Sequence, residues 1–194
     1  APARVAIIGG GYVAVELAGV LQALGSRVEL FVRGPRLLAH MDAEVATAFQ
    51  RGLTKQGMTF RMGTKVTAAK VDDAGVELTV EPAAGGAAET VRGDVVLVAI
   101  GRRPYTAGLG LETVGIETDK RGFLNNDHLK TGKDGVWVIG DVTHGPMLAH
   151  KAEEDAVAAV ELIAGKPGHV DYDLVPSVIY TTPEVAWVGK TEEQ

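Results

Sequence analysis

Arg4-Val-Ala-Ile-Ile-Gly-Gly-Gly-Tyr-Val-Ala14 is the stretch on which the fold prediction depends. Its first five residues form a short apolar run, which is typical of a buried parallel strand. Gly9–Gly11 end that run, and apolar residues then recur at helical spacing, at Val13, Leu17, Val20, Leu21 and Leu24. Gly25 ends this helix at its C′ position, and Val28–Val32 forms a second strand. The order of strand, glycine turn, helix and strand predicts a βαβ unit.

The glycine turn has the spacing of a dinucleotide-binding loop. Gly9 permits the tight turn, and Gly11 lacks a Cβ, so the backbone can approach a pyrophosphate. Ala14 holds the third position, where a small residue lets helix and strand pack closely. The helix start, with Tyr12 and Val13, then offers free N–H groups and partial positive charge. A glycine-rich turn without a ligand is the alternative, but the flanking strand and helix favour a nucleotide site.

The end of the second strand bears on which nicotinamide cofactor binds. NAD sites usually place an acid about 20 residues after the glycines, where it bonds the ribose 2′-OH. Here that position is Val32, and Arg33 follows it. Arg33 offers a bidentate, charge-assisted partner for a 2′-phosphate, and Arg36 could add a second contact. The pattern predicts NADP(H) over NAD(H); the alternative is that both arginines are solvated loop charges.

The following residues predict the rest of an α/β domain. A helix begins at Asp42 or Ala43 and ends at Gly57. A strand is expected over Met58–Met62, an antiparallel meander over Val66–Val71, Val76–Glu81 and Glu89–Arg92, and a return to the parallel sheet over Val95–Ile100. Gly101 follows at a carboxyl strand end, where open α/β sheets bind ligands, so it is a candidate cofactor contact. A plain strand-end turn is the alternative for Gly101.

Composition narrows the class of protein. The chain has 194 residues, 46% of them hydrophobic, and a net charge of −6, which argues against nucleic acid as a main partner. No apolar run approaches the roughly 20 residues of a membrane span, and the start of the chain lacks a signal-peptide pattern. There is no cysteine, and therefore no thiol chemistry within these residues. No metal ligand set is expected.

Three later stretches resemble the flavin-dependent pyridine-nucleotide disulfide oxidoreductases, and within them the dihydrolipoamide dehydrogenases. They are Ala99-Ile-Gly-Arg-Arg-Pro-Tyr105 with Leu109-Gly-Leu-Glu112, Gly140-Asp-Val-Thr-His-Gly-Pro-Met-Leu-Ala-His-Lys-Ala-Glu153, and Val175–Gln194. The second is the most specific. The resemblance implies an enzyme that passes a hydride between NAD(P)(H) and FAD and couples it to a dithiol–disulfide pair.

The first third of the chain departs from that pattern. Gly11–Gly19 and Leu30–Arg33 look more like glutathione reductases, which use NADP(H). Dihydrolipoamide dehydrogenases typically have Gly in place of Ala14 and Glu in place of Val32, whereas the second arginine of glutathione reductases falls at Ala39. The resemblance therefore implies a dihydrolipoamide dehydrogenase with a pocket recast for NADP(H), whether by design or as a natural variant.

The resemblance also assigns residues to the flavin. Asp141, at the end of an expected strand Val136–Ile139, would bond the ribityl hydroxyls of FAD. Met147, Leu148, Ala149 and His150 would lie where a helix N-terminus meets the flavin pyrimidine ring; that helix carries an apolar stripe of Ala152, Ala156, Val157, Val160 and Ile163. His150 could equally be a capping or surface residue.

Two residues of the first helix are assigned to the nicotinamide–flavin contact. The resemblance places Glu16 there, paired with a lysine from outside these residues, and makes Tyr12 an aromatic lid over the flavin. A carboxylate near a helix start is also favoured by the dipole, and Tyr12 could simply pack on the helix start.

The expected architecture is a Rossmann-type parallel sheet with an antiparallel meander, followed by part of a FAD-binding domain and the start of an α+β dimerisation domain. The expected domains are 1–103 for NAD(P), 104–168 for the second part of the FAD site, and 169–194 for the start of dimerisation. The resemblance places the redox cysteines before Ala1 and the histidine base after Gln194. No catalytic residue is therefore assigned within the chain, which should bind a dinucleotide without reducing disulfides. The apolar strand Val175–Tyr180 is expected to lack partners and to be prone to aggregation.

Three functional hypotheses stand at this point. The first is an NADP(H)-using dihydrolipoamide dehydrogenase, a homodimer in a bacterial cytoplasm or a mitochondrial matrix, with lipoyl domains of 2-oxo acid dehydrogenase complexes as partners. The second is a glutathione-reductase-like disulfide reductase, which Val13–Arg33 favours and Met147–Glu153 disfavours. The third is a non-catalytic dinucleotide-binding module, which a Cys-x₄-Cys pair upstream would exclude.

Overall fold

The computed structural model describes residues Ala1–Gln194, which divide into two compact units. Unit 1 comprises residues 1–101 together with 176–194, and unit 2 comprises residues 102–175. None of the helices is long and apolar enough to span a bilayer.

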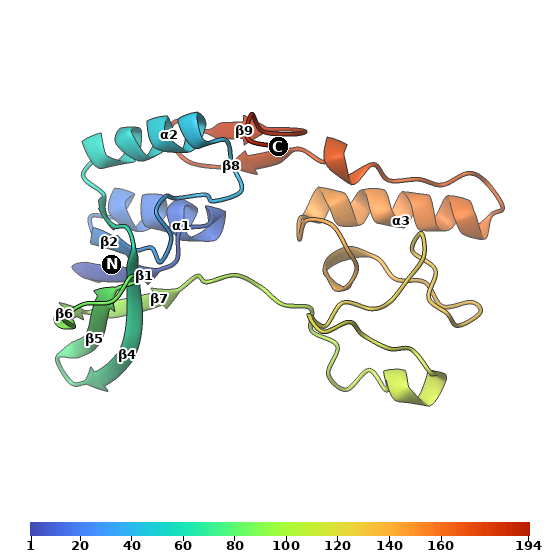
Figure 1. The fold of residues 1–194 in the computed structure, drawn as a ribbon, viewed down its shortest axis with the longest axis horizontal. Coiled ribbons are helices and arrows are strands. Elements are labelled where there is room, and N and C mark those ends of the chain that lie inside the picture. The colour runs from blue at the N-terminus through green and yellow to red at the C-terminus, as the bar shows by residue number, and fades with distance from the viewer. The chain divides into compact units, whose positions relative to one another are not determined.

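Unit 1 is built on a four-stranded parallel sheet in the order β3-β2-β1-β7 (Figure 1). The strands are β1 (Arg4–Ile8), β2 (Arg27–Phe31), β3 (Thr59–Arg61) and β7 (Val95–Val98). Helix α1 (Tyr12–Ala23) connects β1 to β2, and Gly25 follows the helix end with φ +92°, as expected for a C′ glycine. The predicted βαβ unit, the α/β class and the return of Val95–Val98 to the sheet are confirmed.

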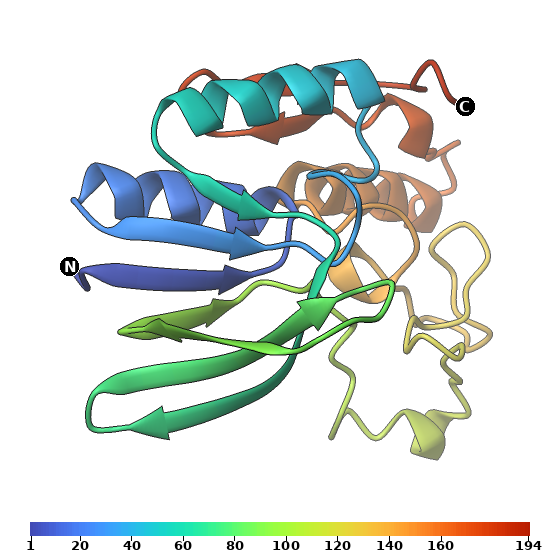
Figure 2. The same ribbon diagram turned by 60° about the vertical axis from the view of Figure 1, so that its left-hand side comes forward.

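The two faces of this sheet are covered differently (Figure 2). Helices α1 and α2 (Ala43–Lys55) cover one face, and alternate strand residues such as Ile7 and Leu30 pack there. On the other face Ala6 and Phe31 pack against the antiparallel meander of β4 (Thr64–Asp72), β5 (Gly75–Pro82) and β6 (Glu89–Gly93). The central strand β1 is therefore buried on both faces, which explains why it reads as a continuous apolar run.

The face of α1 that packs on the sheet differs from the apolar stripe of the sequence. Ala14, Val15 and Ala18 are fully buried, whereas Val20 and Leu24 are 55% and 65% exposed. Val13 and Leu17, each 38% exposed, belong to the same outward stripe. The short glycine turn holds α1 close to β1, which favours small or β-branched side chains at the buried positions. Leu21, also part of the predicted stripe, is partly buried and does pack on the main cluster.

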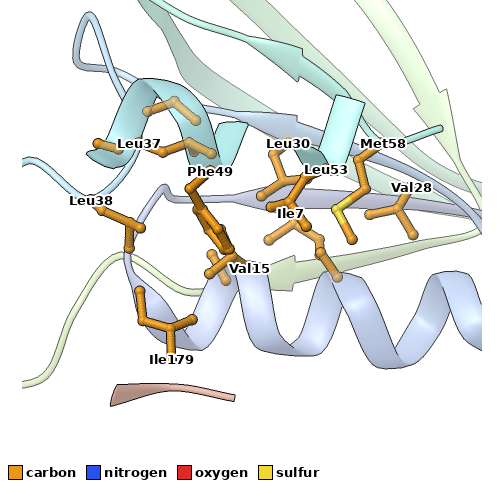
Figure 3. Packing of buried hydrophobic residues seen from close by; sticks show 14 of the residues in the cluster. Ile7, Val15, Val28, Leu30, Leu37, Leu38, Phe49, Leu53, Met58 and Ile179 are labelled. Carbon is orange, nitrogen blue, oxygen red and sulfur yellow. The ribbon is translucent and has the colours of Figure 1, made fainter. Parts of the chain in front are cut away.

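The last residues of the chain complete the core of unit 1. Strands β8 (Ser177–Ile179) and β9 (Val185–Trp187) pair antiparallel, and Ile179 has no exposed surface. Ile179 belongs to the main hydrophobic cluster, together with residues of α1 and β2 (Figure 3). The prediction that Val175–Tyr180 lacks partners is wrong, because β8 within this stretch pairs with β9 and its Ile179 side chain is buried in the core of unit 1.

Unit 2 contains little regular structure besides helix α3 (Ala149–Ile163). The 3₁₀ turns η1 (Leu111–Val114), η2 (Gly140–Val142) and η3 (Tyr172–Leu174) and two small apolar clusters account for most of the rest. The expected strand Val136–Ile139 is absent: only an isolated bridge between Lys130 and Trp137 forms, since no neighbouring strand runs along this segment.

The apolar stripe predicted for α3 is also not its buried face. The side chains of Val157, Val160 and Ile163 are 58%, 64% and 60% exposed. The buried side chains are Lys151, Asp155, Ala158 and Ala159. In the sequence, Lys151 and Asp155 have the spacing of a surface ion pair on a helix. The apolar periodicity therefore assigned the opposite side of α3 to the core.

Candidate functional site

The Gly9–Gly11 turn lies between the ends of three neighbouring strands. Gly9 N donates to Phe31 O at 3.0 Å, at the end of β2. Gly9 has φ +132°, and a Cβ at this position would lie 2.2 Å from Ala99 O, just after β7. Only glycine fits there. The loop is thereby fixed at the carboxyl edge of the sheet, where α/β proteins bind their ligands.

Gly11 begins α1 and is open to solvent. A Cβ built on Gly11 would meet nothing within 4 Å. No side chain caps the helix N-terminus, and its first turn contains no acidic residue. The helix end therefore keeps its partial positive charge without a competing carboxylate, which suits an anion.

The end of β2 carries the residues predicted to select the cofactor. Val32 is only 4% exposed and packs against Gly10, because a Cβ on Gly10 would lie 2.7 Å from Val32 Cγ1. Arg33 is exposed, and no hydrogen bond or ion pair engages its guanidinium. The guanidinium of Arg33 is therefore a cation without a partner within unit 1. It lies just after the end of β2, the strand to which Gly9 of the glycine turn donates a hydrogen bond.

Arg36, the second predicted cation, has partners within unit 1. Its Nη1 donates to Glu193 Oε1 at 3.1 Å, and its Nη2 donates to Ala39 O at 3.1 Å. Glu193 Oε1 also accepts from Ala43 N, at the start of α2, at 2.9 Å. The hydrogen bond from Arg36 lowers the pKa of Glu193 below its usual value. The charge of Arg36 is therefore already paired with a carboxylate of unit 1.

Glu16 and Tyr12, the residues assigned to the nicotinamide–flavin contact, lie on α1. Glu16 Oε1 accepts a hydrogen bond from Tyr180 N at 2.9 Å, so its carboxylate is bound to the segment that follows β8. Tyr12 is half-buried and packs against the main hydrophobic cluster. Both side chains thus have a structural role in unit 1, and their functional assignment stays a prediction.

Gly101, the remaining candidate of unit 1, follows β7 with φ +117°. A Cβ at Gly101 would meet nothing within 4 Å, so its surroundings are open. This glycine is needed for the backbone conformation, and its predicted contact with a cofactor stays a prediction.

The predicted flavin residues of unit 2 occupy η2 and the start of α3. Asp141 lies in η2 with an exposed carboxylate, and Leu148 is the N-cap of α3. No side chain caps this helix and no acid lies in its first turn, which begins with Ala149 and His150. The uncapped helix end can therefore favour a negative charge.

Sequence reasoning missed the residue that connects these two segments. Arg102 Nη1 lies 3.7 Å from Asp141 Oδ2, and Arg102 Nη2 donates to Met147 O. Asp141 and Met147 are thus brought together by one guanidinium. Arg102 lies within the Ala99–Tyr105 stretch of the resemblance, but 39 positions separate it from Asp141, so no local spacing predicts their contact.

No group of three or more His, Cys, Asp or Glu side chains is placed to hold a metal ion.

The sequence profile of the pyridine nucleotide-disulphide oxidoreductase family matches residues 1–156. Dihydrolipoyl dehydrogenase 3 of Pseudomonas putida is 56% identical over 193 residues, and the mitochondrial dihydrolipoyl dehydrogenase of Pisum sativum is 53% identical over 194. Both matches cover 100% of this chain but only 41% and 39% of the relatives, so the chain spans about 40% of their length.

Solved structures agree with the sequence relatives. LpdA of Mycobacterium tuberculosis superimposes with a TM-score of 0.87 at 27% identity, covering 97% of this chain and 40% of that one. The HOCl-induced flavoprotein disulfide reductase RclA of Escherichia coli gives a TM-score of 0.87 at 29% identity, covering 100% of this chain and 44% of that one.

Proposed function

The chain belongs to the pyridine nucleotide-disulphide oxidoreductase family, and we propose that it supplies the nicotinamide-nucleotide site and part of the FAD site of a dihydrolipoamide dehydrogenase. The observation that carries this proposal is the Gly9–Gly11 turn, fixed against Ala99 and followed by the uncapped start of α1. Relatives named dihydrolipoyl dehydrogenases, at more than 50% identity across the whole chain, support the substrate class.

The residues present fit the two cofactors of the family. In unit 1, the open space at Gly11 and the uncapped helix end would hold a pyrophosphate. In unit 2, the exposed Asp141 carboxylate would accept hydrogen bonds from the flavin's polyol, and Met147–His150 at the start of α3 would face its ring. Bound FAD supplies the coupling of hydride transfer to dithiol–disulfide chemistry. These 194 residues contain no cysteine, so the thiols for that exchange come from outside them.

The domain roles and the assembly are part of the same proposal. Residues 1–103 would bind NAD(P), residues 104–168 would belong to the FAD domain, and residues 169–194 would begin a dimerisation domain. A homodimer with lipoyl domains as partners fits the substrate class. The relatives include a bacterial and a mitochondrial enzyme, so either compartment suits the chain.

We infer a preference for NADP(H), with Arg33 as the main contact of the 2′-phosphate. Val32 provides no carboxylate to repel a phosphate or to bond a ribose 2′-OH. Arg33 is exposed and unpaired, so it can bind an anion without losing an existing partner. Arg36 is held by Glu193 and would contribute less.

Arg33→Ala is expected to weaken NADPH binding by about ten- to a hundredfold, the range for losing one charge-assisted contact. NADH binding should change little, because NADH has no 2′-phosphate. Titration calorimetry of the 194-residue chain with each nucleotide measures both. The double variant Val32→Glu with Arg33→Ala should shift the preference toward NADH.

Arg36→Ala and Glu193→Gln serve as matched controls for Arg33→Ala. Arg36→Ala should cost less NADPH affinity, and Glu193→Gln should leave it equal or increased, since it frees the guanidinium of Arg36. Unchanged NADPH affinity in the Val32→Glu, Arg33→Ala variant would show that the pocket assignment is wrong. If the unaltered chain binds neither nucleotide, the proposed function itself fails.

A second candidate, an NADPH-dependent reductase of a disulfide such as glutathione disulfide, is favoured by the buried Val32 and the unpaired Arg33. The two are separated by turnover of the full flavoprotein with lipoamide and with glutathione disulfide. A rate that is substantial only with glutathione disulfide would favour the second candidate.

A further inference from the structure

Unit 2 contains a buried ion pair that the proposed function does not use. Lys151 and Asp155 lie one turn apart on α3, and their side chains are 1% and 0% exposed. Lys151 Nζ lies 2.8 Å from Asp155 Oδ2. Buried charges are costly unless every polar atom has a partner, so such a pair calls for an explanation beyond stability.

Both charges act on the backbone of a single residue, Gly140, through the two peptide groups on either side of its Cα. Lys151 Nζ donates to Gly140 O at 2.8 Å, and Gly140 N donates to Asp155 Oδ2 at 2.9 Å. Gly140 has φ +73°, a left-handed conformation, and it immediately precedes Asp141. The pair therefore holds both the N–H and the C=O of Gly140. Because Gly140 precedes Asp141, its backbone conformation sets the direction in which the chain continues into Asp141.

Tyr172 and Gly145 enclose the pair. Tyr172 OH donates to Asp155 Oδ1 at 2.9 Å, and Lys151 Nζ lies 5.5 Å from the centroid of the Tyr172 ring. Burial and the contact with Asp155 raise the pKa of Tyr172 well above its usual value, so its hydroxyl stays a donor. A Cβ at Gly145 would lie 2.8 Å from Lys151 Cε and 3.1 Å from Tyr172 Cδ1. The loop before α3 thus rests directly on the Lys151 side chain.

We propose that Lys151 and Asp155 are positioning residues for the flavin site: they hold the Gly140–Asp141 turn and the loop leading to Met147 in the geometry that receives FAD. This inference rests on the proposed function of Asp141. Aliphatic side chains could fill the same space, but they could not bond both the N–H and the C=O of Gly140. The charged pair therefore specifies a backbone conformation, which packing alone would leave free.

The test begins with the 194-residue chain, labelled with ¹⁵N. In the variant Lys151→Met with Asp155→Leu, apolar groups replace both charges, so neither charge is left buried alone. We expect the Gly140 amide to exchange with solvent roughly a hundredfold faster, a larger increase than at the other amides of α3. The melting temperature should fall as well, because the N–H and C=O of Gly140 lose their partners. Tyr172→Phe is the matched control, because it touches Asp155 but not Gly140, and its Gly140 amide should stay protected.

A second variant covers the case in which the double variant does not fold. Asp155→Asn keeps the shape of the side chain but removes its charge, so the Gly140 amide proton should shift upfield as its charge-assisted hydrogen bond becomes a weaker, neutral one. Unchanged exchange in the double variant, or an unchanged Gly140 resonance in Asp155→Asn, would overturn the positioning role.

FAD affinity in the full flavoprotein separates this inference from the proposed function. Asp141→Ala and the double variant should each weaken FAD binding about tenfold or more, and Tyr172→Phe should not. If Asp141→Ala leaves FAD affinity unchanged, the proposed role of Asp141 fails. If Asp141→Ala weakens binding but the double variant does not, only the positioning inference fails.

Discussion

Gly9→Ala is expected to lower the free energy of unfolding of unit 1 by about 2–6 kcal/mol and to abolish binding of the nicotinamide nucleotide. The added Cβ would lie 2.2 Å from Ala99 O and 2.8 Å from Ala99 C, both backbone atoms. Ala99 cannot move away, because its N–H donates to Ile8 O at 2.8 Å. The residue also has φ +132°, where a side chain is strained. Strain and overpacking therefore add.

Gly11→Ala is the control that separates folding from binding. A Cβ at Gly11 meets nothing within 4 Å, and φ there is −86°, so stability should change by less than about 1 kcal/mol. The same Cβ would stand in the proposed path of the pyrophosphate, so NADPH affinity should still fall. Chemical denaturation and NADPH titration of both variants measure the two effects. A Gly9→Ala protein with parental stability would contradict the geometry of the turn.

The parts of the fold that the sequence predicted are those set by neighbouring residues. The βαβ unit follows from one apolar run, one glycine turn and one helical repeat. The start of α2 was equally local: Asp42 accepts hydrogen bonds from Glu44 N at 3.0 Å and Val45 N at 3.1 Å, as an N-cap does. The antiparallel meander was predictable because its turns and alternation lie within about thirty residues.

What the sequence could not predict depends on residues far apart in the chain. The ion pair of Arg36 joins it to Glu193, and only the fold brings these residues together. The buried faces of α1 and α3 were misjudged because periodicity identifies an apolar stripe without saying what covers it. Lys151 and Asp155 had the spacing of an ordinary surface ion pair, and only the fold brings Gly140, Gly145 and Tyr172 against them.

Ile179→Ala is expected to lower the free energy of unfolding of unit 1 by about 2–5 kcal/mol, although the sequence placed this residue on a strand without partners. Ile179 is fully buried in the main hydrophobic cluster and lies on β8, which pairs with β9. Removing its branched side chain would leave a cavity between that strand pair and the rest of the unit. Partly buried Val185 and Trp187 pack on the same cluster, so the loss should loosen the whole strand pair.

Ile100→Ala is the matched control for Ile179→Ala, since it removes the same side chain from the same unit at a position that is 74% exposed. Its effect on unfolding should stay within about 0.5 kcal/mol. Urea denaturation followed by the fluorescence of Trp187 in a Trp137→Phe background reports on unit 1, because Trp187 packs on the cluster and Trp137 belongs to unit 2. If residues 175–180 were instead a free apolar strand, Ile179→Ala would reduce aggregation and leave the unfolding transition unchanged. The two pictures therefore predict opposite results: a destabilised protein if β8 and β9 complete the core, and a more soluble protein of equal stability if they do not.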